Sequence, residues 1–256
     1  MIEEKSNQVP WTIQQTSLGL IATLVPWIVI IFALNSLTGD KAIRSTPLPP
    51  QADLVNAIVT FILSCLIEGA FLIAPLYFAN YAYRAITPHL RLALRALGFR
   101  GFNISKAFPW IALLVLAILA VDNLYQYVIT VLHLNLQTND QVILAHSKYA
   151  PLTTYATLLA AVFVAPICEE VFFRGFVFMG LRQAMPLGWA IVLSAFFFAV
   201  AHGDPGSFAV LFIIGLALAF LRWRTNSLWP GILLHLVNNG IGALAIILVM
   251  QGVAKP

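Results

Sequence analysis

The sequence predicts an all-α bundle of membrane-spanning helices, and two observations lead to this fold class. Hydrophobic residues make up 61% of the 256 residues and charged residues only 9%, whereas an ordinary soluble domain carries about 25% charged residues. The apolar residues also gather in runs close to the roughly 20 residues that a helix needs to cross a bilayer. Both observations place the whole chain in the membrane class.

We expect about seven spans, with six and eight as the limits. The predicted spans are 17–37, 54–80, 108–132, 153–181, 187–203, 207–222 and 229–250. The first span is expected to be a retained helix rather than a signal peptide, because no small-residue cleavage site follows it. The span at 207–222 is short, so the preceding stretch "GDPG" is expected at membrane depth, facing a cavity rather than lipid.

The chain divides by composition into two parts. Residues 1–107 are predicted to form N-terminal transmembrane helices and a basic interfacial segment, and residues 108–256 a transmembrane core. The basic residues of the interfacial segment are Arg84, Arg91, Arg95, Arg100 and Lys106. Within it, "PHLRLALRALGF" is predicted to form an amphipathic helix on the membrane surface. No internal repeat is apparent.

The distribution of basic residues predicts how the chain crosses the membrane. Nine fall on the side of the N-terminus: Lys5, Arg84, Arg91, Arg95, Arg100, Lys106, Arg182, Arg222 and Arg224. Four fall on the other side: Lys41, Arg44, Lys148 and Lys255. Because cytoplasmic loops carry the excess of Lys and Arg, we expect a cytoplasmic N-terminus and an external C-terminus.

Composition also argues against two other classes of protein. The only cysteines, Cys65 and Cys168, both lie in apolar runs, so we expect core thiols rather than a disulfide framework. No basic stripe with interleaved aromatic residues is present, so a nucleic-acid partner is not expected. The lipid bilayer is the partner that the sequence itself indicates.

The stretch "CEEVFFRG" places charge inside the fourth span, where charge is costly. Glu170 and Arg174 are four residues apart, share a helix face and are predicted to form an ion pair. Glu169 is left without that partner, and its face neighbours are Phe172 and Phe173. An unpaired glutamate in apolar surroundings is suited to act as a general base. The alternative is a structural ion pair with a spare glutamate that faces water.

His202, at the end of the fifth span, is predicted to lie level with Glu169. The fourth and fifth spans form a hairpin that turns near Met185 and Pro186. Glu169 precedes this turn, and His202 follows it, by similar numbers of residues, so each lies about 25 Å from the turn. The two side chains are therefore at similar depth and can face each other.

The seventh span carries a second polar pair, His235 and Asn239, four residues apart on one face. Both can donate hydrogen bonds to one point, as in an oxyanion site. They could also act as metal ligands or form a polar contact between helices. Glu68 and Asp122 are expected to face the bundle interior, lining a water path or bonding backbone, and neither is expected to be catalytic. His89, His133 and His146 need no functional explanation.

The three motifs in this order resemble one family. Glu-Glu-x-x-x-Arg at 169–174, Phe-x-x-x-His at 198–202 and His-x-x-x-Asn at 235–239 are similar to those of the CPBP family. This family comprises CAAX prenyl endopeptidases and bacteriocin-processing proteins, also called Abi. The resemblance covers roughly residues 150–245, including the lead-in "NSLWPGILLH".

The resemblance implies an intramembrane endopeptidase of a bacterial plasma membrane that acts on membrane-anchored peptides, with lipidated CAAX-like tails among the candidates. Glu169 and His202 would activate water, His235 and Asn239 would stabilise the oxyanion, and Glu170 and Arg174 would support them. The resemblance favours a glutamate-dependent mechanism without a cofactor. Zinc held by Glu169, His202 and His235 is the alternative.

Two other functions remain open from the sequence. A proton-coupled transporter would use intramembrane Glu, Asp, His and Arg side chains in a proton relay, but the absence of an apparent repeat argues against it. A non-catalytic immunity or scaffold protein would bind peptide without cleaving it. The sequence names neither the substrate nor the oligomeric state.

Overall fold

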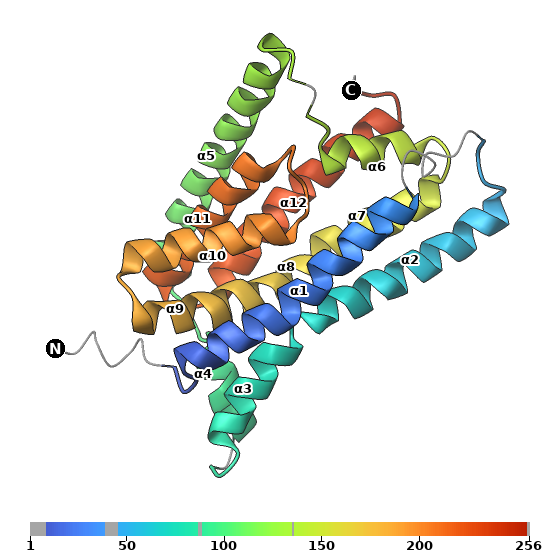
Figure 1. The fold of residues 1–256 in the computed structure, drawn as a ribbon. Helices are drawn as coiled ribbons and strands as arrows, with labels where there is room; N and C mark the ends of the chain where they lie inside the picture. Colours follow the sequence, from blue (N-terminus) through green and yellow to red (C-terminus); the bar gives the residue numbers. More distant parts are fainter. Residues whose placement is uncertain (1–8, 39–45, 87–88, 135, 255–256) are drawn as a thin grey trace.

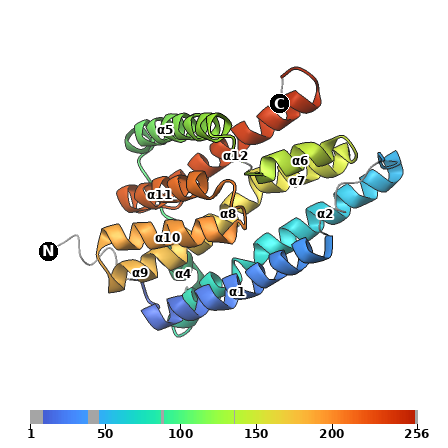
Figure 2. The same cartoon turned by 45° about the horizontal axis from the view of Figure 1, so that its top comes forward.

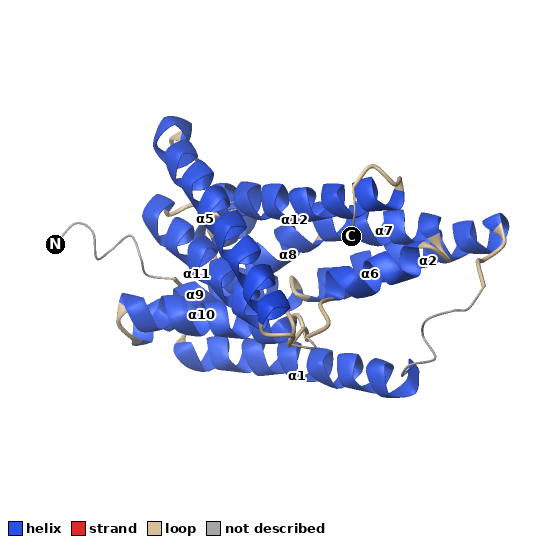
Figure 3. Ribbon diagram, turned by 90° about the horizontal axis from the view of Figure 1, so that it is seen from above, coloured by secondary structure: helices blue, strands red, loops and turns tan. Residues whose placement is uncertain are grey.

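The computed structural model describes residues 9–38, 46–86, 89–134 and 136–254, and within these ranges every regular element is helical (Figures 1 and 3). The elements are α1 (Ile13–Thr38), α2 (Pro50–Ala70), α3 (Ile73–Tyr83), α4 (His89–Leu97), α5 (Ile104–Val131), α6 (Asn139–Ser147), α7 (Pro151–Phe163), α8 (Ala165–Glu169), the π-helix η3 (Glu170–Val177), α9 (Phe178–Ala184), α10 (Leu187–Ala201), α11 (Phe208–Thr225) and α12 (Trp229–Met250). The predicted all-α fold class is confirmed.

The number of spans agrees with the predicted range of six to eight. Six helical stretches among the described residues are long and apolar enough to cross a membrane: Ile13–Ile31, Pro50–Ala70, Ile104–Val131, Pro151–Ala184, Phe208–Thr225 and Trp229–Met250. Leu187–Ala201 is a shorter apolar helix. Large apolar side chains such as Leu18, Leu66 and Leu116 point outward and are more than half exposed, as expected for surfaces that face lipid. The protein is therefore an integral membrane protein.

The continuous stretch α7–α8–η3–α9 forms the centre of the bundle (Figures 1 and 2). α2 packs along α7, α10 along η3 and α9, and α11 along α10, while α12 contacts α7, α8 and α11. α1 lies against α3, η3 and α9, and α5 covers α11 and α12 from outside. α1 begins at one end of the bundle and α12 finishes at the other (Figure 1). Which end is cytoplasmic stays a prediction.

The predicted single span at 54–80 is wrong. The chain forms α2 up to Ala70, breaks at Phe71 and Leu72, and continues as α3 in a different direction (Figure 1). Pro75 accounts for the break, because its ring clashes with the carbonyl four residues earlier and it has no N–H to donate there. The break leaves Phe71 buried beneath the central stretch, where its ring packs on Phe172 at 5.2 Å between centroids.

The interfacial segment contains the predicted amphipathic helix, α4. It buries Ala93, Ala96 and Leu97 and exposes Arg91 and Arg95, so one face packs on α3 and η3 while the other carries charge. Whether the exposed face lies on a membrane surface stays a prediction.

The turn "GDPG" between α10 and α11 is bonded to neighbouring segments of the protein. Asp204 is buried and accepts hydrogen bonds from the backbone N–H groups of Ser207, at 3.0 Å, and Asn139, at 2.9 Å. The hydroxyl of Tyr125 donates to the carbonyl of Gly206 at 2.6 Å. These bonds hold the turn against α5 and the start of α6.

Asp53 in the first turn of α2 joins that helix to the start of α7. Its buried carboxylate accepts hydrogen bonds from the backbone N–H groups of Leu152 (2.8 Å) and Thr153 (3.0 Å) and from the Thr153 hydroxyl (2.7 Å). Ala150, the N-cap residue of α7, makes no side-chain cap of its own. Asp53 therefore supplies the cap from a neighbouring helix, where negative charge is also favoured by the helix dipole.

Replacing Asp53 by alanine is expected to lower the free energy of unfolding by about 1.5–3 kcal/mol, because first-turn N–H groups of α7 lose a charged acceptor. Thermal unfolding in detergent, followed by circular dichroism, measures the change. Gln51→Ala, at an exposed position in the same turn of α2, is the matched control and should unfold like the wild type. Equal unfolding of Asp53→Ala and Gln51→Ala would contradict the inter-helix cap.

Candidate active site

The central stretch bends where the first motif begins. α7 ends at Phe163 and α8 starts at Ala165, with Pro166 in its first turn. A proline inside a continuous helix removes one i→i−4 hydrogen bond and kinks the chain. Directly after the kink, Glu170–Val177 is π-helical, and the backbone N–H of Phe178 reaches the carbonyl of Phe173. Such segments are rare and are frequent at functional sites.

The predicted ion pair between Glu170 and Arg174 is present and fully buried. The two side chains are 0% exposed, and Nη1 of Arg174 lies 2.9 Å from Oε1 of Glu170. Nη2 of Arg174 donates to the carbonyl of Gly215 on α11 at 3.2 Å, and its guanidinium carbon lies 4.2 Å from the centre of the Phe198 ring. The pair therefore joins η3 to α10 and α11 at the base of the site.

Gly215 makes this junction possible. A Cβ at this position would lie 2.8 Å from the Cα of Ala195 on α10, so only glycine lets α10 and α11 approach this closely. Small residues at helix contacts are the common means of close packing in membranes. The close approach brings the Gly215 carbonyl within reach of Arg174.

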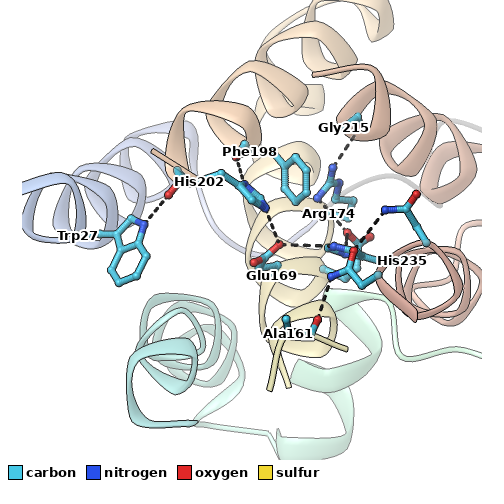
Figure 4. Close-up of polar contacts among 12 residues, drawn as sticks. Trp27, Ala161, Glu169, Arg174, Phe198, His202, Gly215 and His235 are labelled. Atoms are coloured by element: carbon cyan, nitrogen blue, oxygen red, sulfur yellow. Dashed lines mark hydrogen bonds and ion pairs between the residues drawn. The ribbon is translucent and has the colours of Figure 1, made fainter. Parts of the chain in front are cut away.

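Glu169, His202 and His235 come together from α8, the end of α10 and α12 (Figure 4). Oε2 of Glu169 lies 3.8 Å from Nε2 of His202 and 3.8 Å from Nε2 of His235. The side chain of His202 is 24% exposed, that of Glu169 11% and that of His235 2%. The site is therefore reached from the side of His202, while His235 forms its inner wall.

The tautomer of His202 follows from its backbone contact. Its Nδ1 lies 2.8 Å from the carbonyl oxygen of Phe198, and a carbonyl can only accept, so Nδ1 carries the hydrogen. In the neutral imidazole, Nε2 is then an acceptor that faces Glu169. At 3.8 Å, the Glu169 oxygen and this nitrogen are too far apart for a direct hydrogen bond. One water molecule can donate a hydrogen to each of them.

Phe198 supports three polar residues of the site at once. Its ring centroid lies 4.5 Å from that of His202 and 5.6 Å from that of His235, and Arg174 stacks on it. Phe198 is completely buried, so it holds these side chains at fixed separations.

His235 lies between the two glutamates. Its Nε2 faces Glu169, and its Nδ1 lies 3.5 Å from Oε1 of Glu170. Asn239 lies one turn further along α12, and its amide nitrogen donates to the carbonyl of Ala161 in α7 at 2.9 Å. A side-chain amide has two N–H groups, so this bond leaves one for a further acceptor.

Glu68 also lies near the site, which the sequence did not predict. It lies on α2, which packs against α8, and its carboxylate interacts electrostatically with Glu169. Its Oε2 is buried without a hydrogen-bond partner among the described residues. A glutamate in the middle of the predicted span 54–80 was the available signal, but nothing in the sequence indicated the position of α2 relative to α8.

Glu169, His202 and His235, the ligands of the alternative zinc mechanism, lie further apart than the ligand atoms of a bound zinc ion. Ligand atoms of a tetrahedral zinc ion lie about 3.4 Å apart, given bonds of about 2.0–2.2 Å, whereas Oε2 of Glu169 lies 3.8 Å from both imidazole nitrogens. In the part of the chain that the structure describes, no group of three or more His, Cys, Asp or Glu side chains is arranged to hold a metal ion.

Comparison with known proteins points to the same segment. Residues 151–241 match the model of the family described as "Type II CAAX prenyl endopeptidase Rce1-like". A Bacillus subtilis (strain 168) protein named "Putative membrane peptidase YdiL" is 31% identical over 101 residues, which are 40% of this chain and 40% of that protein. An uncharacterized protein of Mycoplasma capricolum subsp. capricolum is 29% identical over 150 residues, 54% of this chain and 43% of that protein.

The matched segment contains all three motifs, so the family resemblance predicted from them is confirmed. The matches span only about two fifths of the length of both relatives. No solved structure matches the chain.

Proposed function

We propose that the protein is an intramembrane endopeptidase that hydrolyses peptide bonds of membrane-anchored substrates. The observation that carries the proposal is the position of Glu169, whose Oε2 lies 3.8 Å from Nε2 of both His202 and His235 within a segment that matches the Rce1-like family. A carboxylate with two imidazole nitrogens close to one of its oxygens brings three groups that can exchange protons to a single point.

Glu169 and His202 activate the attacking water in this proposal. A water that donates to both loses a proton to Glu169 while its oxygen forms a bond to the carbonyl carbon of the peptide. The proton then passes to the nitrogen of the leaving amine as the C–N bond breaks, which yields a carboxylate and a free amine. The 24% exposure of the His202 side chain marks the side from which water and peptide enter.

His235 and Asn239 stabilise the oxyanion of the tetrahedral intermediate. His235 is the inner member, buried between Glu169 and Glu170, and Asn239 offers the N–H that does not bond Ala161. Donors held in a water-poor site are worth more than donors in water. Glu170 and Arg174 do not touch the peptide and act by holding His235 and Phe198 in position.

An apolar pocket beside the site suits a substrate that carries a hydrophobic or lipidated segment. The pocket, about 240 Å³ in volume, lies between α1 and the α2–α3 break and is lined by residues including Trp27, Ile67 and Phe71. Two contacts link it to the site. Trp27 donates to the carbonyl of Ala201, next to His202, at 2.6 Å, and Phe71 packs on Phe172.

Cleavage by the purified protein in liposomes tests the proposal. The substrate is a fluorescent peptide tethered to the bilayer by a lipid chain, and His202→Ala is the inactive control. A proton-coupled carrier would instead take up solute along an ion gradient without cleaving the peptide. A scaffold protein would bind the peptide and release it intact, and either result would overturn the proposal.

We also propose that the reaction is glutamate-dependent and needs no metal. Elemental analysis of the active, purified protein is expected to find zinc well below one equivalent, and chelation is expected to leave the cleavage rate unchanged. The His202→Ala protein, treated in the same way, gives the background zinc content and the background cleavage rate. Stoichiometric zinc whose removal abolishes cleavage and whose addition restores it would contradict this mechanism.

Gly231 offers a test of the site from a residue that makes no polar contact with substrate. A Cβ at this position would lie 2.7 Å from Oε2 of Glu170, so Gly231→Ala displaces the Glu170 carboxylate from its place beside His235. Cleavage is expected to fall by about 10²-fold, because Glu170 positions His235 and a misplacement of about 1 Å in a site can cost that much. Gly240→Ala, on the same helix with open space around the new methyl group, should keep wild-type activity. Equal rates for the two variants would mean that the position of Glu170 does not matter.

A further inference from the structure

A second pocket lies away from Glu169, between the first turns of α5 and the last turn of α11. It has a volume of about 480 Å³, and its lining includes Asn103, Ser105, Lys106, Trp110, Arg224 and Thr225. The surrounding chain is held in place by two hydrogen bonds to backbone carbonyls. Leu228 N–H donates to the Gly98 carbonyl at 2.9 Å, and the Ser227 hydroxyl donates to the Arg100 carbonyl at 2.7 Å.

Positive charge in this pocket lacks a counter-charge. Lys106 and Arg224 are exposed, and no ion pair among the described residues includes either of them. Lys106 also sits in the first turn of α5, where the helix dipole disfavours a cation. The Asn103 side chain caps only the N–H of Lys106, at 3.1 Å, so first-turn N–H groups of α5 remain without an intrahelical acceptor. The pocket therefore suits an anion.

The pocket lies at the level where lipid headgroups meet protein. Its two helices are both candidate spans, and it sits where one begins and the other ends. Next to it, Ile104, Phe108 and Trp223 expose apolar surface. Trp110 packs on Phe220 at 5.3 Å between ring centroids, and tryptophans at span ends are typical of the membrane–water boundary. A ligand in this pocket is thus in contact with lipid on one side and water on the other.

We propose that this pocket binds the phosphate of an anionic phospholipid headgroup, held by Lys106, Arg224 and the N-terminus of α5. Basic pockets between transmembrane helices are known to hold such headgroups. The acyl chains of the lipid extend along the exposed apolar surface at Phe108 and Trp223. This inference does not depend on the proposed peptidase activity, because the pocket uses neither Glu169 nor its partners.

Lipid selectivity of the full-length protein tests the proposal. The purified protein is equilibrated with equal amounts of phosphatidylglycerol and phosphatidylcholine, and the lipids that remain bound are counted by native mass spectrometry. The wild type is expected to retain phosphatidylglycerol about tenfold over phosphatidylcholine. Lys106→Gln/Arg224→Gln should lose this preference, and the charge-conserving Lys106→Arg/Arg224→Lys should keep it.

The matched control removes two other basic residues of the interfacial segment. Arg84→Gln/Arg91→Gln lowers the net charge equally and should leave the preference intact. Equal losses in the two glutamine variants would overturn the proposal, because the effect would then be one of overall charge. Displacement of phosphatidylglycerol by inorganic phosphate at millimolar concentration would also overturn it, since the site would then hold a soluble anion. No preference in the wild type would overturn it directly.

Discussion

Glu169→Gln is expected to reduce the rate of peptide cleavage by about 10²–10⁴-fold, the usual contribution of a general base. Glutamine has the shape of glutamate and keeps a carbonyl oxygen near His202 and His235, but it cannot take a proton from water. Binding of the peptide should change little, because the side chain remains in place. The loss is therefore expected in kcat rather than in KM.

Turnover of the lipid-tethered peptide by reconstituted protein measures this effect. Asp122→Asn is the matched control, since it also converts a carboxylate within a span to an amide, on α5 rather than at the site. That variant should cleave at the wild-type rate. A Glu169→Gln protein that retains most of its activity would rule out Glu169 as the base and would favour Glu68, whose carboxylate is the nearby alternative.

The close relationship of Glu169 and His202 was accessible from the sequence because both positions can be counted from one short turn. The helical rise is nearly constant, so residues at equal distances from a hairpin turn lie at equal depth. The ion pair of Glu170 and Arg174 was accessible for a similar reason, since a spacing of four brings side chains together on a helix. The bounds of α12, Trp229–Met250, agree with the predicted span because Pro230 marks its first turn.

Other features depend on packing between distant segments and leave no local signal. The π-helix at Glu170–Val177 is one, because periodicity assumes regular α-helix, while Ser194 on α10 donates to the carbonyl of Phe173 within it at 3.2 Å. The bond of Asn239 to Ala161 is another, since these residues are 78 positions apart. Pro75 was a signal in the sequence for the break after Ala70, but a span prediction based on hydrophobicity alone does not detect it.

Arg174→Met is expected to cause the largest loss of stability of any single change at the site, about 3–5 kcal/mol. The substitution removes the guanidinium and leaves the Glu170 carboxylate completely buried without its partner at 2.9 Å. It also removes the hydrogen bond to the Gly215 carbonyl and the stacking on Phe198. The unpaired carboxylate accounts for most of the cost, because it cannot reach water without unfolding.

The double variant Glu170→Gln/Arg174→Met separates this effect from simple loss of packing. With the buried charge gone, stability is expected to return to within about 1–2 kcal/mol of the wild type, as when buried ion pairs are replaced by uncharged groups. The free energy of unfolding in detergent is measured for Arg174→Met, Glu170→Gln and the double variant. Together with the wild type, these form a double-mutant cycle that gives the coupling energy between the two side chains. A coupling energy near zero would show that the two side chains contribute independently.

Cleavage assays on Arg174→Met and on the double variant Glu170→Gln/Arg174→Met separate the effect on stability from the effect on catalysis. The double variant should still cleave slowly although its stability is restored. A neutral amide at position 170 would not hold His235 as the Glu170 carboxylate does at 3.5 Å. Phe198 would also lose the cation that stacks on it. Restored stability without restored cleavage is therefore the expected result. It would mean that the charge pair is kept at the base of the site to orient His235 and Phe198, since an uncharged pair would stabilise the bundle nearly as well.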